Sequence, residues 1–290
     1  MNRLIKLFFY KTNWQISSST KSFGNILNDE FFEINLSSQF KNSADPFPFN
    51  NDKQDLLIYE KVNWLTSKGR IKINDRKNNT EKLIIKRRFH LSFPTVFSNE
   101  VDSFLICESA ENNSTFIWKI EKNFQEFSEY SKIDEKLIDP IILYKNGNYF
   151  LIACKRVKDQ EYKMFISTSK NLIEWNVVNE QNIDVLNGNE RNAGNIVIYK
   201  DNLYRLSQIN TPLYGSGIRI NRILNITTNA YSEEFVKEIK IKNNKKNVNG
   251  FHTLNFYDFG CFYDYRIESF DIFSLFYKIV AIFRKKINNL

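Results

Sequence analysis

The sequence predicts an all-β fold, a five-bladed β-propeller followed by an amphipathic helical tail. The first reason is a clear hairpin over 138–153, where Asn146-Gly147 separates two runs of β-branched and aromatic residues. Asn-Gly suits a two-residue type I′ turn because both residues tolerate positive φ. The second reason is that similar hairpins recur at intervals of roughly fifty residues, the period of a radial array with about four strands per unit. The third reason is composition, because 26 Phe and 14 Tyr against 9 Gly and 5 Pro argue against disorder.

The repeated unit is a strand, a polar turn and a second strand. Its five copies begin near Asp45, Phe93, Asp139, Gly194 and Thr253. Pro follows the first residue of the first three copies, and Pro is tolerated where a strand starts. Five such hairpins predict a single propeller domain over 1–268.

The outer strands of each blade are predicted from apolar runs that follow the hairpins. They lie over 69–73 and 82–85 in blade one, 115–120 in blade two, 162–168 and 175–178 in blade three, and 217–224 in blade four.

Residues 1–43 precede the first repeat and are predicted to form a lead-in that supplies the closing strand. The segment 30–36 alternates acidic and apolar residues and reads as an outer strand. In a closed propeller such a strand completes the last blade and joins the two ends of the chain. We therefore expect the segment 30–36 to pair with blade five.

Residues 269–290 differ from the repeats and predict a basic amphipathic tail. One helical face would carry Phe273, Phe276, Tyr277, Val280 and Phe283. Such a helix could pack on the side of the propeller, or the end could be disordered. A third interpretation is an interfacial helix over 270–286 whose cationic end contacts an anionic membrane surface.

Charge and composition narrow the classes of partner. The 290-residue chain carries a net charge of +8, which favours anionic partners. The charges are spread along the chain, however, and this pattern also fits ordinary solvated faces. Because there is no concentrated basic stripe and no recognition helix, nucleic acid is not an expected partner.

The cysteines indicate a reducing compartment. Cys107, Cys154 and Cys261 lie in or beside apolar strands, form no CxxC pair and are odd in number, which speaks against a disulfide framework. No segment reaches about 18 uninterrupted apolar residues, and the apolar run at the N-terminus is too short for a signal peptide. We expect a cytoplasmic protein, peripheral to the inner face of the membrane if the tail binds lipid.

Acidic residues recur where the blades enter the central funnel. Asp45 and Asp139 stand directly before the Pro of blades one and three, and Glu60 and Glu108 end the second strands of blades one and two. Glycoside chemistry needs two carboxyl groups across one sugar, and crowding raises the pKa of at least one of them. We therefore predict Asp45, Glu108 and Asp139 as catalytic. The alternative is that each Asp-Pro is a strand-start turn in which Asp caps its own backbone.

Seven further polar residues are predicted to bind substrate in the funnel. They are Glu60, His90, Arg191, Asn192, Arg205, Arg222 and His252. The arginines could hold a phosphate or carboxylate by bidentate contacts, or could pair with surface acids. No zinc spacing, P-loop or dinucleotide fingerprint is present, so neither a metal nor a cofactor is predicted.

As an ordered set, these motifs resemble a known family. The set is Ala44-Asp45-Pro46-Phe47, Gly69-Arg70-Ile71, His90-Leu91-Ser92-Phe93-Pro94, Glu108-Ser109, Asp139-Pro140, Tyr204-Arg205, Gly215, Asn221-Arg222-Ile223 and His252-Thr253. It is similar to the propeller domain at the N-terminus of the plant glucosamine inositolphosphorylceramide transferases and their bacterial homologues. More distantly, it is similar to the five-bladed glycosidases of families 43, 32 and 68.

The resemblance implies a sugar-related role, which in bacterial relatives is surface polysaccharide assembly. By similarity to the glycosidases, Asp45 would be the base or nucleophile, Asp139 the orienting acid and Glu108 the proton donor. Two departures stand out. Blade two opens with His90 and Ser92 where those glycosidases carry a second Asp, and this chain lacks the separate transferase domain of the plant protein.

Two functions remain open at this level. One is a glycan-active enzyme, a glycosyltransferase or processing enzyme of surface polysaccharide or glycolipid synthesis. The other is a non-catalytic propeller that binds a carbohydrate or sugar-phosphate ligand and assists a partner glycosyltransferase.

Overall fold

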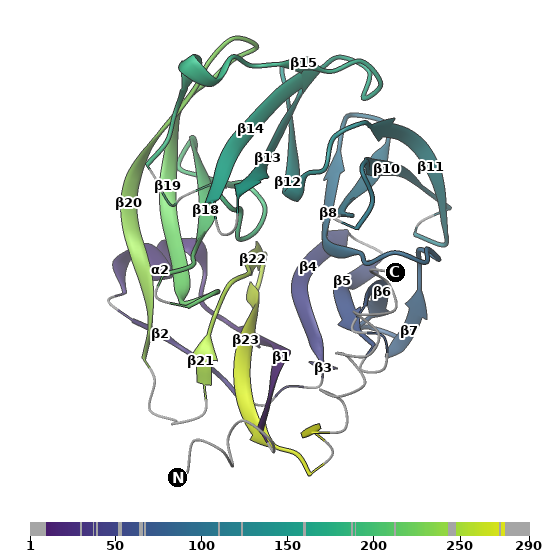
Figure 1. Ribbon diagram of the computed structural model, residues 1–290, viewed down its shortest axis with the longest axis vertical. Coiled ribbons are helices and arrows are strands. Elements are labelled where there is room, and N and C mark those ends of the chain that lie inside the picture. The colour runs from purple at the N-terminus through teal and green to yellow at the C-terminus, as the bar shows by residue number, and fades with distance from the viewer. Residues whose placement is uncertain are drawn as a thin grey trace.

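Five β-sheets are arranged radially around a common centre in the computed structural model (Figure 1). The structure describes residues 10–29, 31–36, 38, 40–51, 54–63, 66, 68–109, 111–122, 124–158, 161–186, 188, 190–211, 213–242, 248–272 and 274–275. The predicted five-bladed propeller is confirmed.

The first three blades are antiparallel sheets of four strands in chain order. Blade one contains β4 (Ser43–Asn51), β5 (Gln54–Val62), β6 (Gly69–Asp75) and β7 (Thr80–Leu83). Blade two contains β8 (Ser92–Ser98), β9 (Ser103–Glu108), β10 (Thr115–Glu121) and β11 (Glu126–Ile133). Blade three contains β12 (Ile138–Lys145), β13 (Asn148–Lys158), β14 (Glu161–Ser169) and β15 (Asn176–Val177).

Blade four has additional strands on its outer edge. Its main strands are β17 (Val197–Tyr199), β18 (Asn202–Ile209), β19 (Gly217–Ile226) and β20 (Tyr231–Lys242). Two short strands pair with β20 in parallel, β16 (Ile183–Asp184) and β2 (Phe31–Glu33). The short helices are α2 (Phe23–Asn28), which starts with a capping box formed by Ser22, and the 3₁₀ turn η1 (Glu180–Asn182).

Blade five is assembled from both ends of the described chain. Its strands are β22 (Leu254–Tyr257), β23 (Gly260–Phe270), β1 (Tyr10–Ser19) and β3 (Phe40–Lys41), with β21 (Val248–Gly250) also on β23. The closing pair runs from Tyr10 opposite Phe270 to Ser19 opposite Cys261. The expectation for the segment 30–36 is therefore wrong, because its strand β2 pairs with blade four, and β1 closes the ring instead.

Apolar side chains pack between neighbouring blades, and Phe47, Phe93 and Ile141 of the innermost strands lie in a further cluster that spans several blades. Ile58 and Leu105, for example, lie in one cluster shared by blades one and two, and both are fully buried. Complete burial of such a side chain contributes about 1.5–3 kcal/mol, so the blade faces hold the ring together. This arrangement leaves the innermost strands free to present polar groups at the centre.

The inner strands of the first three blades share a bulge at their entry. Asp45, Phe93 and Asp139 all have positive φ, at 51°, 50° and 46°. The strand register shifts at each of these positions. The three X-Pro pairs are thus one repeated backbone feature, and the three residues occupy equivalent places in their blades.

Several other expectations concern the tail, the thiols and the membrane. Cys107, Cys154 and Cys261 are buried and free, as predicted. All five residues of the predicted helical face, Phe273, Phe276, Tyr277, Val280 and Phe283, lie outside the described residues, so the tail remains a prediction. In the part of the chain that the structure describes, no helix is both long and apolar enough to cross a membrane.

Candidate functional site

A cavity of about 950 Å³ lies where the inner strands converge. Its lining includes the carboxyl groups of Asp45, Glu60, Glu108 and Asp139. Arg191 and the two histidines line it as well. The structure therefore brings the three predicted catalytic acids into one cavity, together with four of the seven predicted binding residues.

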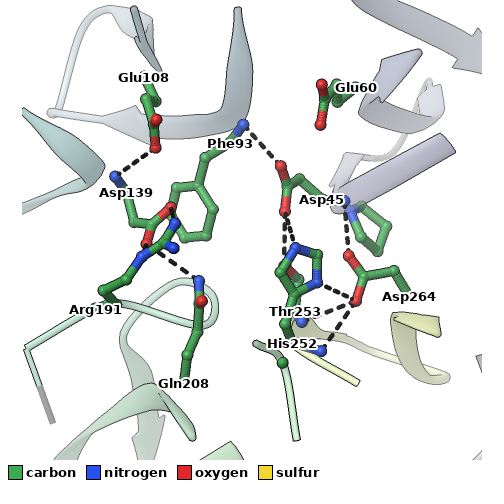
Figure 2. A network of polar contacts seen from close by, with 12 residues as sticks. Asp45, Glu60, Phe93, Glu108, Asp139, Arg191, Gln208, His252, Thr253 and Asp264 are labelled. Carbon is green, nitrogen blue, oxygen red and sulfur yellow. Dashed lines mark hydrogen bonds and ion pairs between the residues drawn. The ribbon is translucent and has the colours of Figure 1, made fainter. Parts of the chain in front are cut away.

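The repeated bulge links each blade to the blade before it. The positive φ turns the backbone N–H of the bulge residue toward a carboxylate of the preceding blade (Figure 2). Asp45 N donates to Asp264 Oδ2 at 3.0 Å, and Phe93 N donates to Asp45 Oδ2 at 3.0 Å. Asp139 N donates to Glu108 Oε2 at 3.1 Å. Two cavity carboxyl groups, Asp45 and Glu108, and the buried Asp264 thus also hold neighbouring blades in register.

Asp45 lies at the centre of one half of the cavity. Its Oδ1 accepts a hydrogen bond from Thr253 Oγ1 at 2.8 Å and lies 3.7 Å from His252 Nε2. Burial raises the pKa of Asp45 to about 6, although the nearby His252 charge opposes the shift. At neutral pH this carboxyl group is mostly ionised and can accept a proton.

His252 is fixed by Asp264 from behind. Its Nδ1 lies 2.7 Å from Asp264 Oδ1, and its ring stacks on Trp14 at a centroid distance of 3.9 Å. Burial disfavours the imidazolium, but the attraction of Asp264 outweighs it and raises the pKa of His252. The His252 ring is therefore held between Asp264 and Asp45, whose charges favour its protonated form.

Glu108 occupies the other half of the cavity. Withdrawal from water and the Asp139 charge raise the pKa of Glu108 to about 8, while the Arg191 charge acts in the opposite direction. Glu108 is hydrogen-bonded to Asp139 twice, through the Asp139 backbone N and between the two carboxyl groups, and the second contact favours the protonated form of Glu108. At neutral pH Glu108 mostly holds its proton.

Asp139 is saturated by its neighbours. Arg191 binds it in a bidentate manner, Nε to Oδ2 at 2.7 Å and Nη2 to Oδ1 at 3.0 Å. Gln208 Nε2 donates to the same Oδ2 at 3.1 Å. Asp139 therefore positions Arg191 and acts on Glu108 through its charge.

Glu60 and His90 form a second layer at the rim of blades one and two. Burial and the charge of Asp45 raise the pKa of Glu60 well above its ordinary value. His90 Nδ1 accepts a hydrogen bond from Gly69 N at 2.8 Å, so its Nε2 carries the hydrogen and faces Glu60 Oε1 at 3.5 Å. A Cβ on Gly69 would lie 2.1 Å from Glu60 Oε1, which explains the glycine in the Gly69-Arg70-Ile71 motif.

One group of side chains among the described residues could offer ligand atoms to a metal ion. Asp45, His252 and Asp264 present such atoms within 4.8 Å of one another. The Asp264 oxygens, however, already accept four N–H groups, from Asp45 N, His252 N, His252 Nδ1 and Thr253 N. This donor set does not fit a metal site, so we interpret the group as a hydrogen-bonded ion pair.

Asn192 lies behind the cavity rather than on its wall. Its Nδ2 donates to the backbone oxygens of Asp139 and Ile152, and its Oδ1 accepts from Arg205 Nη1 at 3.1 Å. The side chain is fully buried. It joins blades three and four, and the structure gives it no contact with the cavity.

Arg205 and Arg222 also lie away from the cavity. Arg205 is fully buried and donates through Nε to Glu233 Oε2 at 2.7 Å. Arg222 pairs with Glu234 on an exposed part of blade four. Their positions do not support the expectation that these two arginines contact a ligand in the funnel.

Asp264, Gln208, Trp14 and Tyr214 contribute to the site but were not predicted. Asp264 had a detectable signal, because it ends an apolar second strand just as Glu60 and Glu108 do. The other three carry no comparable pattern. Trp14 reaches the cavity only through the pairing of β1 with β23.

Comparison with known families shows to which protein family the chain belongs. The family model described as glucosamine inositolphosphorylceramide transferase 1, N-terminal, matches residues 16–260. The chain belongs to this family. A relative named glucosamine inositolphosphorylceramide transferase 1, from Arabidopsis thaliana, is 27% identical over 213 residues, which are 66% of this chain and 26% of that protein. A relative of the same name from Oryza sativa subsp. japonica is 26% identical over 228 residues, which are 74% of this chain and 30% of that protein. The chain thus spans less than a third of the length of these relatives.

Solved structures share the fold. A thermostable family-43 glycoside hydrolase superposes with a TM-score of 0.53 at 8% identity, covering 70% of this chain and 78% of that chain. A xylan beta-1,4-xylosidase from Bacillus halodurans C-125 superposes with a TM-score of 0.52 at 13% identity, covering 70% and 45%. At such identities the likeness establishes a common architecture and nothing finer.

Proposed function

We propose that the central cavity is a glycan-processing active site in which Glu108 donates a proton and Asp45 acts as base or nucleophile. The observation that carries this proposal is a pair of carboxyl groups in one cavity with pKa values of about 8 and about 6. When the surroundings of two carboxyl groups make their pKa values differ in this way, one group can act as an acid and the other as a base at neutral pH. Retaining and inverting glycoside hydrolases both use such a pair.

The neighbouring groups support these two roles. Arg191 and Asp139 form a bidentate pair beside Glu108, so the local charge is fixed before a ligand arrives. His252, fixed by Asp264, places a positive charge near Asp45 and keeps part of its population ionised. His252 and Asp264 are positioning residues in this scheme.

The relatives suggest the class of substrate. Two of them are named as transferases of glucosamine inositolphosphorylceramide, a sugar-bearing lipid. Together with the acid–base pair, this favours a glycosyltransferase or processing enzyme that acts on a glycolipid or a surface polysaccharide. We propose that class for this chain.

The test is turnover of defined donors and acceptors. Purified protein is incubated with sugar nucleotides and with lipid-linked or polysaccharide acceptors, and the products are read by mass spectrometry. Glu108→Gln and Asp45→Asn should each lower turnover by about 10²–10⁴-fold, the usual contribution of a general acid or base. Glu126→Gln, a change on the exposed outer strand β11, is the matched control and should keep wild-type turnover. Wild-type turnover in either cavity variant would reject the roles assigned here.

A binding role is the second candidate, because the oxygens of Asp45 and Asp139 already accept protein donors. In that case the propeller would hold a glycan or sugar phosphate for a partner glycosyltransferase. Saturable binding of a sugar by the wild-type protein, with no product from any donor, would favour this function over catalysis.

A further inference from the structure

A second hollow of about 1000 Å³ opens between blades three and four. Its walls come from strand β14, from residues 183, 185, 188 and 190, and from residues 209–211 and 213–214. Arg191 and Tyr214 line both this groove and the central cavity. The two hollows are therefore adjacent, with these two side chains between them.

The boundary between the hollows is a stack of alternating cations and rings. The Arg191 guanidinium lies 5.4 Å from the Tyr162 ring centre and 5.1 Å from the Tyr214 ring centre. The Arg156 guanidinium lies 5.7 Å from the Tyr162 ring centre and donates to the Tyr162 hydroxyl at 3.3 Å. Because Arg191 also holds Asp139, a ligand that contacts this stack touches the group that positions the active site.

The groove has no unbalanced charge among the cations that line it. Lys163 pairs with Glu180 at 3.1 Å, and Arg219 pairs with Glu238 at 3.0 Å. Three carboxylates, Glu161, Glu180 and Glu190, also line the groove and equal its three cations in number. Asn210, Thr211 and aromatic and aliphatic groups complete the lining, and Leu213 is 55% exposed. A lining with balanced formal charge and both polar and apolar surface suits an uncharged ligand that presents both C–H faces and hydroxyl groups. A sugar chain has this chemistry.

We propose that the groove between blades three and four binds the further sugar units of an uncharged oligosaccharide whose terminal unit occupies the carboxyl cavity. This inference rests on the proposed glycan function and adds that the ligand has more than one sugar unit. Arg191 and Tyr214 mark the junction between the two units.

The test compares chain lengths of one sugar. The protein is first screened on an array of neutral oligosaccharides to identify one that it binds. The monosaccharide to tetrasaccharide members of that sugar series are then titrated into the full-length protein by calorimetry. Affinity should rise by about tenfold or more between the monosaccharide and the longer members, equivalent to about 1.4 kcal/mol. Leu213→Ala should remove most of that gain, whereas Leu224→Ala, which changes an equally exposed leucine outside the groove, should keep it.

The outcomes separate the two proposals. If the monosaccharide binds as tightly as the tetrasaccharide, the groove proposal is overturned while turnover by Glu108 and Asp45 can still stand. If phosphorylated or sulfated members bind more tightly and lose this advantage at high salt, the uncharged class is wrong. If no sugar binds and no donor is turned over, both proposals fail.

Discussion

Phe93 shows whether the bulge at Asp45 and Asp139 requires an acidic side chain. All three residues adopt the same positive φ at the same bulge, yet Phe93 has no carboxyl group. The turn therefore does not require Asp, and the predicted alternative of an Asp that caps its own backbone does not describe Asp45. Its carboxylate accepts from Phe93 N and Thr253 Oγ1, which belong to other blades. Positive φ in a non-glycine residue costs of order 1–3 kcal/mol, and these hydrogen bonds offset part of that cost.

The pH dependence of turnover follows from Asp45 and Glu108. Asp45 must be ionised to accept a proton, so activity should fall as pH drops below about 6. Glu108 must hold a proton to donate it, so activity should fall as pH rises above about 8. The pH profile of kcat/KM should be a bell between these values. A profile that stays flat up to pH 10 would rule out Glu108 as the proton donor.

Glu108 also makes a prediction for stability. Its pKa is about 8 in the folded protein and near 4.5 when unfolded, so the unfolded chain releases the proton first as pH rises. The stability that the protonated group provides is complete below about pH 4.5 and is lost as pH rises toward 8. Glu108→Gln cannot ionise, so its free energy of unfolding relative to wild type should increase from pH 5 to pH 9. The gain should be of order a few kcal/mol at most, because the side chain still faces the open cavity.

The measurement for this stability prediction is urea unfolding of both proteins at several pH values. Glu126→Gln again serves as the control, because its carboxylate is exposed and paired only with Lys122 on the surface. A free-energy difference between Glu108→Gln and wild type that stays constant or falls from pH 5 to pH 9 would contradict the raised pKa of Glu108.

At the scale of elements, the hairpins could be predicted from the sequence, whereas the pairing of strands far apart in the sequence could not. The hairpin of β12 and β13 is encoded locally, because Asn146-Gly147 sets the turn and the apolar runs set the strands. Strand β1 is rich in Ser, Asn, Gln and Thr and lacks the apolar pattern of the repeats. Its strand identity comes from pairing with β23 at the opposite end of the chain, which local sequence does not reveal.

Local sequence also does not show which way a side chain on a strand points, and this explains why the predicted ligand contacts of the blade-four arginines are not supported. Successive side chains of a strand point to opposite faces, and Gln208 of β18 points toward Asp139. Arg205 lies three residues earlier and therefore faces away, toward Glu233 of β20. The residue type of Arg205 suggested a ligand contact, but the face of the strand on which it lies determines that it contacts Glu233 instead. The acids were predictable because their positions relative to the repeat fix the face.

At the scale of the whole molecule, ring closure and the site depend on the same strand. Trp14 of β1 stacks on His252, and Gly215 fits against both because a Cβ there would lie 2.9 Å from Trp14 and 3.1 Å from His252. Blade five thus supplies Trp14, the aromatic side chain that packs on His252 beside Asp45. The geometry of the cavity therefore depends on the strand pairing that closes the propeller.

The substitution Gln15→Pro tests this dependence. Gln15 pairs with Tyr265 on one side and Lys41 on the other, so Pro at this central position removes ladder hydrogen bonds and introduces a clash. We expect a loss of about 3 kcal/mol or more in the free energy of unfolding, with sugar binding and turnover lost together. Val101→Pro, at an exposed turn of blade two, is the control, because it adds a proline at the cost of one local hydrogen bond to Asn99 Oδ1 and no strand pairing. Thermal unfolding followed by circular dichroism, with turnover measured on the same samples, reads both effects. A Gln15→Pro protein that keeps turnover while its melting temperature falls would show that the cavity forms without a closed ring.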